Sequence, residues 1–338
     1  MATNAPAGSS QTANDHPLFL LPSMRSDLAR VDAELLKSVE TDDDLLTEIA
    51  GHLIRAGGKR LRPGFCVAAA ASIAASPGPA SQEAVLAGVS VELVHLGSLY
   101  HDDVMDEALT RRTVDSVNAR WGNLKAILGG DFLLAKASEI AAGLGTEVAA
   151  LLAATIGKLC EGQVRELRNM FDVGRTEAAY LAAISGKTAA LFAAACRIGA
   201  LVAGHPRDVV ERLTSFGEQY GMAFQIIDDI LDVVATDEQL GKPAGNDLVQ
   251  GVYTLPVIRA LHGGEGAKLR ASLGQPLAVA QMYVARDLVR ADGAVASALA
   301  SAQEFCWHAV EALEPLGPTP AATALRDAAQ RLIGSIPS

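Results

Sequence analysis

Residues 91–112 read VELVHLGSLYHDDVMDEALTRR, and residues 224–232 read FQIIDDILD. In each stretch the apolar residues recur three and four positions apart, which is the spacing of an α-helix. Each stretch also contains a DDxxD triplet. Positions i, i+1 and i+4 fall within an arc of roughly 100° on a helix, so a triplet presents three carboxylates on one side. Two helices with acidic faces are therefore predicted, formed by Asp102, Asp103 and Asp106 and by Asp228, Asp229 and Asp232.

The helical spacing recurs through most of the 338 residues, and we find no convincing alternating strand. Apolar residues make up 50% of the chain and aromatic residues only 4%, and the abundant alanine favours helices over strands. We predict an all-α bundle formed by a single domain over residues 17–338, after a flexible tail at 1–16. The predicted helical segments lie near residues 26–40, 43–56, 81–107, 124–143, 146–170, 187–204, 207–235 and 293–312.

Charge and cysteine spacing limit the classes of partner and the compartment. The 28 basic and 39 acidic residues give a net charge of −11, which argues against a nucleic-acid partner. The four cysteines lack the spacing of a zinc site or a redox pair, so we expect a reduced, cytoplasmic location with most thiols buried. We see no signal peptide and no uninterrupted apolar span, and therefore expect a soluble protein.

The surroundings of the two triplets favour a metal site. A single DDxxD would be read as a solvated helix face, but Val94, Leu96 and Leu99 precede the first triplet and apolar residues surround the second. Two carboxylates about 6 Å apart repel by about 3 kcal/mol at an effective dielectric constant of 20, so clustered aspartates require cations. Oxygen ligands without histidine or cysteine partners suit Mg²⁺, with Mn²⁺ as the alternative, better than zinc.

Basic residues stand near both triplets in the sequence. Each one alone is more often a surface residue, but their proximity to the aspartates points to a common site. Arginine and lysine can bind diphosphate oxygens while a metal bridges those oxygens to aspartate, an arrangement that stabilises diphosphate as a leaving group. These residues are Lys59, Arg62, Arg111, Arg112, Lys187 and Lys242.

Together with GGKRLRP at 57–63, GKT at 186–188 and GKPAGND at 241–247, the paired triplets resemble the trans-isoprenyl diphosphate synthases, or polyprenyl synthetases. The likeness extends over roughly residues 40–330. It implies an all-α bundle around a deep central cavity, a homodimer, and condensation of isopentenyl diphosphate with an allylic diphosphate. The implied reaction ionises the allylic diphosphate, joins the isopentenyl double bond to the cation and passes a proton to the departing diphosphate.

The resemblance also implies roles for individual residues. Asp102, Asp103, Asp106, Asp228 and Asp232 would coordinate magnesium on the allylic diphosphate, with Asp229 assisting. Arg111, Lys187 and Lys242 would hold that diphosphate, whereas Lys59, Arg62, His95 and Arg112 would bind isopentenyl diphosphate. Thr188 and Gln225 would line the region where the carbocation forms. A lone histidine on an apolar helix is usually a core residue, but His95 lies about 20° from Asp102 around an ideal helix, which favours the site.

The sequence departs from the family pattern at two places. Where the family commonly has RRGxP, residues 111–115 read RRTVD, which keeps both arginines but changes the turn. The chain ends RLIGSIPS, without the basic residues that many members carry there.

Product length in this family is limited by bulky side chains just upstream of the first triplet. Those positions are Gly97 and Ser98 here, with Ser98 the better candidate for contact with the cavity. We predict a long-chain, all-trans product of hexaprenyl size or greater, suited to a quinone side chain, and transient membrane contact for its release.

Several alternatives predict other sequence features. A short-chain farnesyl or geranylgeranyl synthase remains open, and a terpene cyclase would normally mix Ser, Thr or Glu into its second motif. A head-to-head prenyl synthase would carry different acidic motifs. A non-catalytic regulatory subunit should have damaged aspartate motifs, and a ferritin-like bundle needs Glu-x-x-His pairs that we do not find.

Overall fold

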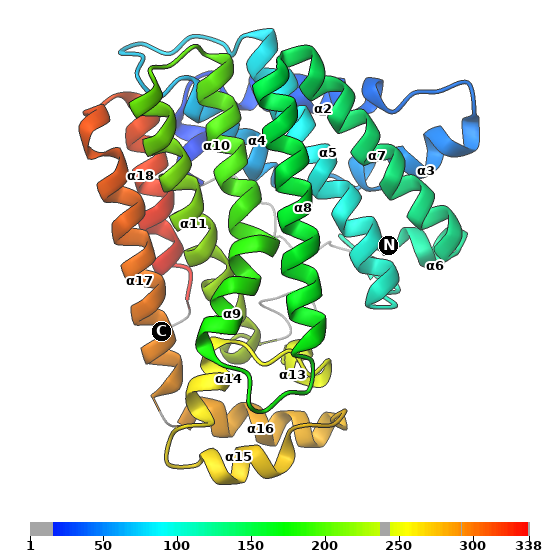
Figure 1. Ribbon diagram of the computed structural model, residues 1–338, viewed down its shortest axis with the longest axis vertical. Helices are drawn as coiled ribbons and strands as arrows, with labels where there is room; N and C mark the ends of the chain where they lie inside the picture. The colour runs from blue at the N-terminus through cyan, green and yellow to red at the C-terminus, as the bar shows by residue number, and fades with distance from the viewer. Residues whose placement is uncertain (1–15, 237–243, 292, 337–338) are drawn as a thin grey trace, which may run out of the picture. The chain divides into compact units, whose positions relative to one another are not determined.

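The computed structural model describes residues 16–236, 244–291 and 293–336, which are arranged almost entirely as helices (Figure 1). The prediction of an all-α fold is confirmed. In chain order the elements are η1 (Pro17–Leu20), α2 (Met24–Ser38), α3 (Asp44–Arg55), α4 (Leu61–Ala70), α5 (Gln82–Met105), β1 (Thr110–Arg111), β2 (Val114–Asp115), α6 (Val117–Trp121), α7 (Asn123–Leu144), α8 (Thr146–Arg168), α9 (Glu177–Ile184), η2 (Ser185–Ala189), α10 (Ala190–Val202), α11 (Arg207–Val234), α13 (Asn246–Val249), α14 (Leu255–Ala260), α15 (Gly266–Ser272), α16 (Val279–Ala291), α17 (Ala294–Leu313), η3 (Glu314–Leu316) and α18 (Pro320–Ile333).

Contacts within the chain group it into two compact units. The first comprises Met1–Ile156, Ala194–Thr214 and Pro315–Ala328, and the second comprises Gly157–Ala193, Ser215–Glu314 and Ala329–Ser338. The single domain over 17–338 therefore stays a prediction, and the predicted tail at 1–16 lies, apart from His16, outside the described residues.

In the first unit α5 is the central helix, and it packs against α2, α4 and α7. Its sequence is apolar on every side, as expected of a helix that is buried all round. The helix begins where the Ser81 side chain accepts a hydrogen bond from the Ala84 amide, and it ends at Asp106. The first aspartate triplet thus lies at the carboxyl end of a rigid core helix.

Glycines allow α7 to lie directly against α5, and the two helices run side by side in Figure 1. A Cβ on Gly97 would stand 3.1 Å from the Gly130 carbonyl oxygen, and one on Gly130 would overlap the His101 ring. Tyr100 is fully buried between them and donates to the Ile49 carbonyl of α3 at 2.7 Å. These contacts fix the last two turns of α5.

In the second unit α11 carries the other triplet. Its glycines pack closely, since a Cβ on Gly221 would stand 2.5 Å from Ala189 Cα and one on Gly217 the same distance from the Phe192 carbonyl oxygen. Ser185–Ala189 forms one π-helical turn between α9 and α10, a distortion that is frequent at functional sites. Lys187 and Thr188 lie in this turn.

Two helices, Gln82–Met105 and Glu177–Val202, are long and apolar enough to cross a membrane by length and composition alone. Their apolar windows are 72% and 61% buried within the protein, as in the core helices of soluble proteins, which pass the same test.

The structure also contains a short hairpin that we did not predict. Thr110 pairs with Asp115 and Arg111 with Val114 across the turn formed by Arg112 and Thr113. Both turn residues have positive φ, 53° and 67°, as two-residue hairpin turns require. Strands of two residues have no detectable alternation in sequence, so RRTVD predicted only a changed turn.

Candidate active site

The first triplet lies in the last turn of α5, and its three aspartates differ in how far they are exposed to solvent. Asp103 is fully buried, Asp102 is half-buried and Asp106 is exposed at the helix end. The carboxyl end of a helix carries partial negative charge, and α5 has no basic residue in its last turn. Negative charge therefore accumulates at this helix end, as it would at a cation-binding site.

Arg111 on β1 partly offsets this charge. Its Nε donates to Asp103 Oδ1 at 2.8 Å, and its Nη2 donates to the same oxygen. Burial raises the pKa of Asp103, and Arg111 acts in the opposite direction. Asp103 Oδ2 is buried without a hydrogen-bond partner. An orphaned carboxylate oxygen of this kind fits a cation ligand.

Positive charge gathers around His95, two turns earlier on α5. Burial, followed by the charges of Arg62, Arg112, Arg111 and Arg60, lowers the pKa of His95 well below its usual range. Arg62 and Arg112 are half-buried and Lys59 is exposed. The structure thus brings GGKRLRP and RRTVD to the predicted histidine. We call these cations, with His95 and the first triplet, the α5 site.

The second triplet on α11 is held by hydrogen bonds from neutral side chains. Asp229 and Asp232 are 4% exposed, whereas Asp228 is exposed. The Tyr180 hydroxyl donates to Asp229 Oδ2 at 2.6 Å, and Gln225 Nε2 donates to Oδ1 at 2.8 Å. Burial raises the pKa of Asp229 to about 7, although both hydrogen bonds act to lower it.

The π-helical turn joins this network. Thr188 Oγ1 donates to Gln225 Oε1 at 2.7 Å, so Thr188, Gln225, Asp229 and Tyr180 form one chain of hydrogen bonds. Lys187 forms an ion pair with Glu166 of α8. We call these residues and the second triplet the α11 site.

Lys242, the predicted basic residue after the second triplet, lies outside the described residues. The described residues resume at Ala244, and the Asp247 amide donates to Asp232 Oδ2 at 3.2 Å.

The sequence analysis missed several residues that hold the predicted ones. Tyr180, Glu166 and Arg175 act in the second unit, where Arg175 lies 5.4 Å from the Tyr180 ring centre. Glu92 and Arg60 act in the first unit, where they form a buried ion pair. Of these only Glu92 had a sequence signal, because it is a lone charge one turn before His95 in an apolar helix.

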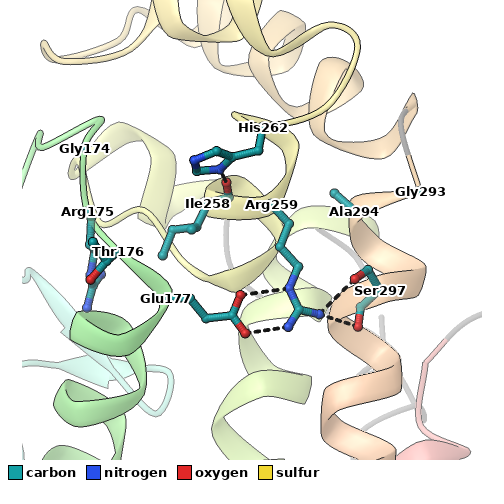
Figure 2. Close-up of a pocket in the computed structure, with 10 residues that line it drawn as sticks. All are labelled: Gly174, Arg175, Thr176, Glu177, Ile258, Arg259, His262, Gly293, Ala294 and Ser297. Carbon is teal, nitrogen blue, oxygen red and sulfur yellow. Dashed lines mark hydrogen bonds and ion pairs between the residues drawn. The ribbon is translucent and has the colours of Figure 1, made fainter.

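A pocket of about 660 Å³ in the second unit includes Arg175 in its lining but none of the predicted site residues (Figure 2). It lies between the start of α9, α14 and the start of α17. Arg259 crosses it and pairs with both carboxylate oxygens of Glu177 at 2.6 and 3.3 Å, and with Ser297 and Ser301. Its guanidinium is already saturated, and no predicted site residue lines the pocket.

The carboxylates suit a divalent metal that is shared with a substrate. Within the described ranges, no three His, Cys, Asp or Glu side chains gather closely enough to hold an ion by themselves. Magnesium usually takes only one or two protein carboxylates and completes its shell with water and phosphate oxygens. The donor set, in which Asp106 and Asp228 are exposed, Asp102 is half-buried and Asp103 has an unpartnered oxygen, fits that kind of ion.

Comparison with known proteins identifies the family. The family model described as polyprenyl synthetase matches residues 43–285. The chain belongs to the polyprenyl synthetase family. It is 40% identical to heptaprenyl diphosphate synthase component 2 of Geobacillus stearothermophilus, over 90% of this chain and 95% of that one. It is 39% identical to nonaprenyl diphosphate synthase of Mycobacterium tuberculosis, over 90% of each chain.

Solved structures of the family share the fold. A polyprenyl synthase from Caulobacter crescentus, complexed with calcium and isoprenyl diphosphate, superposes with a TM-score of 0.87 at 32% identity, over 98% of this chain and 99% of that one. A decaprenyl diphosphate synthase from Rhodobacter capsulatus gives 0.86 at 31% identity, over 94% and 99%. The predictions of a prenyltransferase family and of its isoprenoid synthase fold are confirmed.

The two chain-length candidates differ in their contacts. Gly97 faces α7, as the contact of its virtual Cβ with Gly130 shows, so it allows the two helices to approach. Ser98 is half-buried, and its hydroxyl donates to the His95 carbonyl at 2.8 Å. Their role in product length stays a prediction.

Proposed function

We propose that this chain condenses isopentenyl diphosphate head-to-tail with an allylic diphosphate and builds a long-chain, all-trans polyprenyl diphosphate. The observation that carries the proposal is the α5 site, where Arg62, Arg111 and Arg112 surround His95 beside an acidic helix end. Cations beside carboxylates suit a diphosphate that arrives with a divalent metal. The relatives named heptaprenyl and nonaprenyl synthase favour a long-chain product.

The residues of the two sites have separate tasks in this proposal. Those that bind isopentenyl diphosphate are Lys59, Arg62, His95 and Arg112, and those that hold the allylic diphosphate are Arg111, Lys187 and Lys242. The aspartates of both triplets would hold magnesium, or manganese in its place. When bound, such an ion would supply charge neutralisation that makes the allylic diphosphate a better leaving group.

Positioning and electrostatics supply the rest of catalysis. In this proposal Thr188 and Gln225, which are hydrogen-bonded to each other, line the region where the allylic cation develops. Burial, followed by the charges of the nearby arginines, keeps His95 neutral, so it binds its ligand by hydrogen bonding. The reaction needs no protein nucleophile, because the isopentenyl double bond attacks the cation and the departing diphosphate takes the proton.

The cellular setting belongs to the same proposal. We propose a homodimer in the cytoplasm that touches the membrane transiently to release its product, which would serve as a quinone side chain. Light scattering of the purified chain tests the dimer, and co-sedimentation with lipid vesicles during turnover tests the membrane contact.

Chromatography of reaction products tests the activity itself. Purified protein is incubated with magnesium, isopentenyl diphosphate and a set of allylic primers, and we expect products of hexaprenyl size or greater. Products that stop at geranylgeranyl diphosphate under excess isopentenyl diphosphate would support the short-chain alternative, which agrees with the 38% identity to geranylgeranyl diphosphate synthase of Methanosarcina mazei. Absence of any condensation would reject the proposal.

A further inference from the structure

The first unit contains a buried carboxylate that none of the predicted functions uses. Glu92 of α5 is 2% exposed and lies one helical turn before His95. Arg60 Nη1 donates to its Oε1 at 2.8 Å, and Arg112 Nη2 lies 3.8 Å from the same oxygen. One carboxylate therefore contacts arginines from two separate segments, GGKRLRP and the β1–β2 hairpin.

Arg60 holds the first of these segments in an unusual backbone conformation. Its φ of 46° and ψ of 39° are left-handed, a conformation that is strained for a residue with a side chain. Its guanidinium is 96% buried and donates also to Asp32 at 2.7 Å and to the Ile54 carbonyl at 2.9 Å. These bonds fix the chain where the loop containing Lys59 enters α4.

Arg112 ties the second segment to the first. Its own φ is 53°, and its Nη1 donates to the carbonyls of Gly57 and Leu53. The guanidinium lies so close to Gly58 that a Cβ there would stand 2.9 Å from Nη1. The hairpin and the loop are therefore held together, and the missing side chain of Gly58 leaves room for this approach.

Electrostatics makes Glu92 the residue on which both contacts depend. Burial opposes the charge of Arg60, but Glu92 and then Asp32 outweigh it and raise its pKa. Burial lowers the pKa of Arg112, and Glu92 is the main group that acts against this shift. Without the carboxylate Arg60 would keep only Asp32 as its carboxylate partner among the described residues, and the half-buried Arg112 would lose the main negative charge that compensates it.

We propose that Glu92 is the positioning residue of the α5 site, which sets the geometry of isopentenyl diphosphate binding by fixing Arg60 and Arg112. It does not touch the substrate. Through Arg60 it places the loop that carries Lys59, and through Arg112 it places a cation that contacts the diphosphate. The inference rests on the proposed function for the identity of this substrate.

Steady-state kinetics of Glu92→Gln test the inference, because glutamine keeps the shape and removes the charge. We expect the KM for isopentenyl diphosphate to rise by about tenfold to a hundredfold, the loss that misplaced binding groups cause, while the KM for the allylic primer changes less than about twofold. Glu92→Asp keeps the charge and should restore part of the affinity. Calorimetric titration of isopentenyl diphosphate into the folded variants should show the same order.

Asp27→Asn provides the matched control. Asp27 is another fully buried carboxylate of the first unit, paired with Arg30 at 3.2 Å and accepting from the Ala80 amide. The substitution Asp27→Asn should lower the melting temperature without changing the ratio of the KM for isopentenyl diphosphate to the KM for the allylic primer.

Equal changes of both KM values in Glu92→Gln, or the same ratio in Asp27→Asn, would overturn the inference. If Glu92→Gln does not fold, Glu92→Asp decides, and an unchanged KM for isopentenyl diphosphate there overturns it. These outcomes differ from failure of the proposed function, in which the unmodified protein would not condense the substrates.

Discussion

The α5 site and the α11 site carry the same DDxxD pattern but stabilise it by different means. At the α5 site arginines supply the compensation, since Arg111 pairs with Asp103 and Arg112 stands near Glu92. At the α11 site neutral donors do so, because Tyr180 and Gln225 bind Asp229. The first arrangement cancels charge, whereas the second holds a carboxylate whose pKa has risen to about 7.

This difference predicts that the same motif takes two separate parts in the proposed reaction. Guanidinium groups at the α5 site can rebind to phosphate oxygens, so this site suits an anionic substrate that brings its own charge. Uncharged donors do not neutralise a carboxylate, so its negative charge can still be stabilised by a bound cation. The α11 site therefore suits metal more than phosphate.

Removing one aspartate from each site tests the comparison with the largest expected effect. Asp102→Ala and Asp228→Ala should each lower kcat by about 10²- to 10³-fold or more, because each removes a metal ligand that stabilises the leaving diphosphate. Circular dichroism should show an unchanged helix content. Asp208→Ala is the control, an exposed aspartate at the other end of α11.

Near-normal turnover in either variant, or full activity in excess chelator, would break the assignment of metal to both sites. A large loss in only one variant would place the metal at that site alone.

Replacing one lysine in each site should separate the substrates. Lys59→Ala should raise the KM for isopentenyl diphosphate by about tenfold and Lys187→Ala that for the allylic primer, since a hydrogen bond to a charged group contributes about 1.5–3 kcal/mol. Lys136→Ala on α7, where the lysine pairs only with Glu139 among the described residues, should change neither constant. Equal effects on both substrates would contradict the division.

The sequence predicts well those features that depend on residues close together in the chain. It predicts poorly those that depend on residues far apart in the chain. Helices α5, α8 and α11 match the predicted segments within about two residues, because long apolar periods are local. Helices α16 and α18 were not predicted, and the π-helical turn leaves no periodic signal.

The candidate site divides in the same way. The aspartates are adjacent in sequence and were found, but the residues that hold them are not. Tyr180 and Asp229 are 49 positions apart, and Arg60 and Glu92 are 32 apart. Only the folded chain brings these partners together, so motif spacing could identify the ligands and not their supports.

A pH titration of stability should test whether the folded α5 site keeps His95 neutral. Burial and the nearby arginines lower the pKa of His95, so the folded protein keeps it neutral while the unfolded chain protonates it below about pH 6.5. The unfolded state then binds more protons, and stability falls as pH falls through that value.

Denaturant unfolding of the ligand-free protein at pH 7.5 and 5.5 measures this effect. His95→Gln should lose less stability over the interval than the unmodified protein. Identical pH dependence of the two proteins would mean that burial and the arginines together do not lower the pKa of this histidine.

Ser98→Phe is expected to change turnover least of all these variants. Its expected effect is on the length of the product. Ser98 is half-buried one turn before the first aspartate, and its hydroxyl bonds only within its own helix among the described contacts, so a larger side chain does not break a tertiary hydrogen bond. If the α5 site also limits chain growth, the ring should shorten the product distribution while condensation continues. Gly97→Ala is the comparison, because its Cβ would press on the Gly130 carbonyl and should lower the melting temperature without shortening the product. Product chromatography under excess isopentenyl diphosphate measures both variants. An unchanged distribution in Ser98→Phe would place the limit on growth elsewhere and confine the α5 site to binding and ionisation.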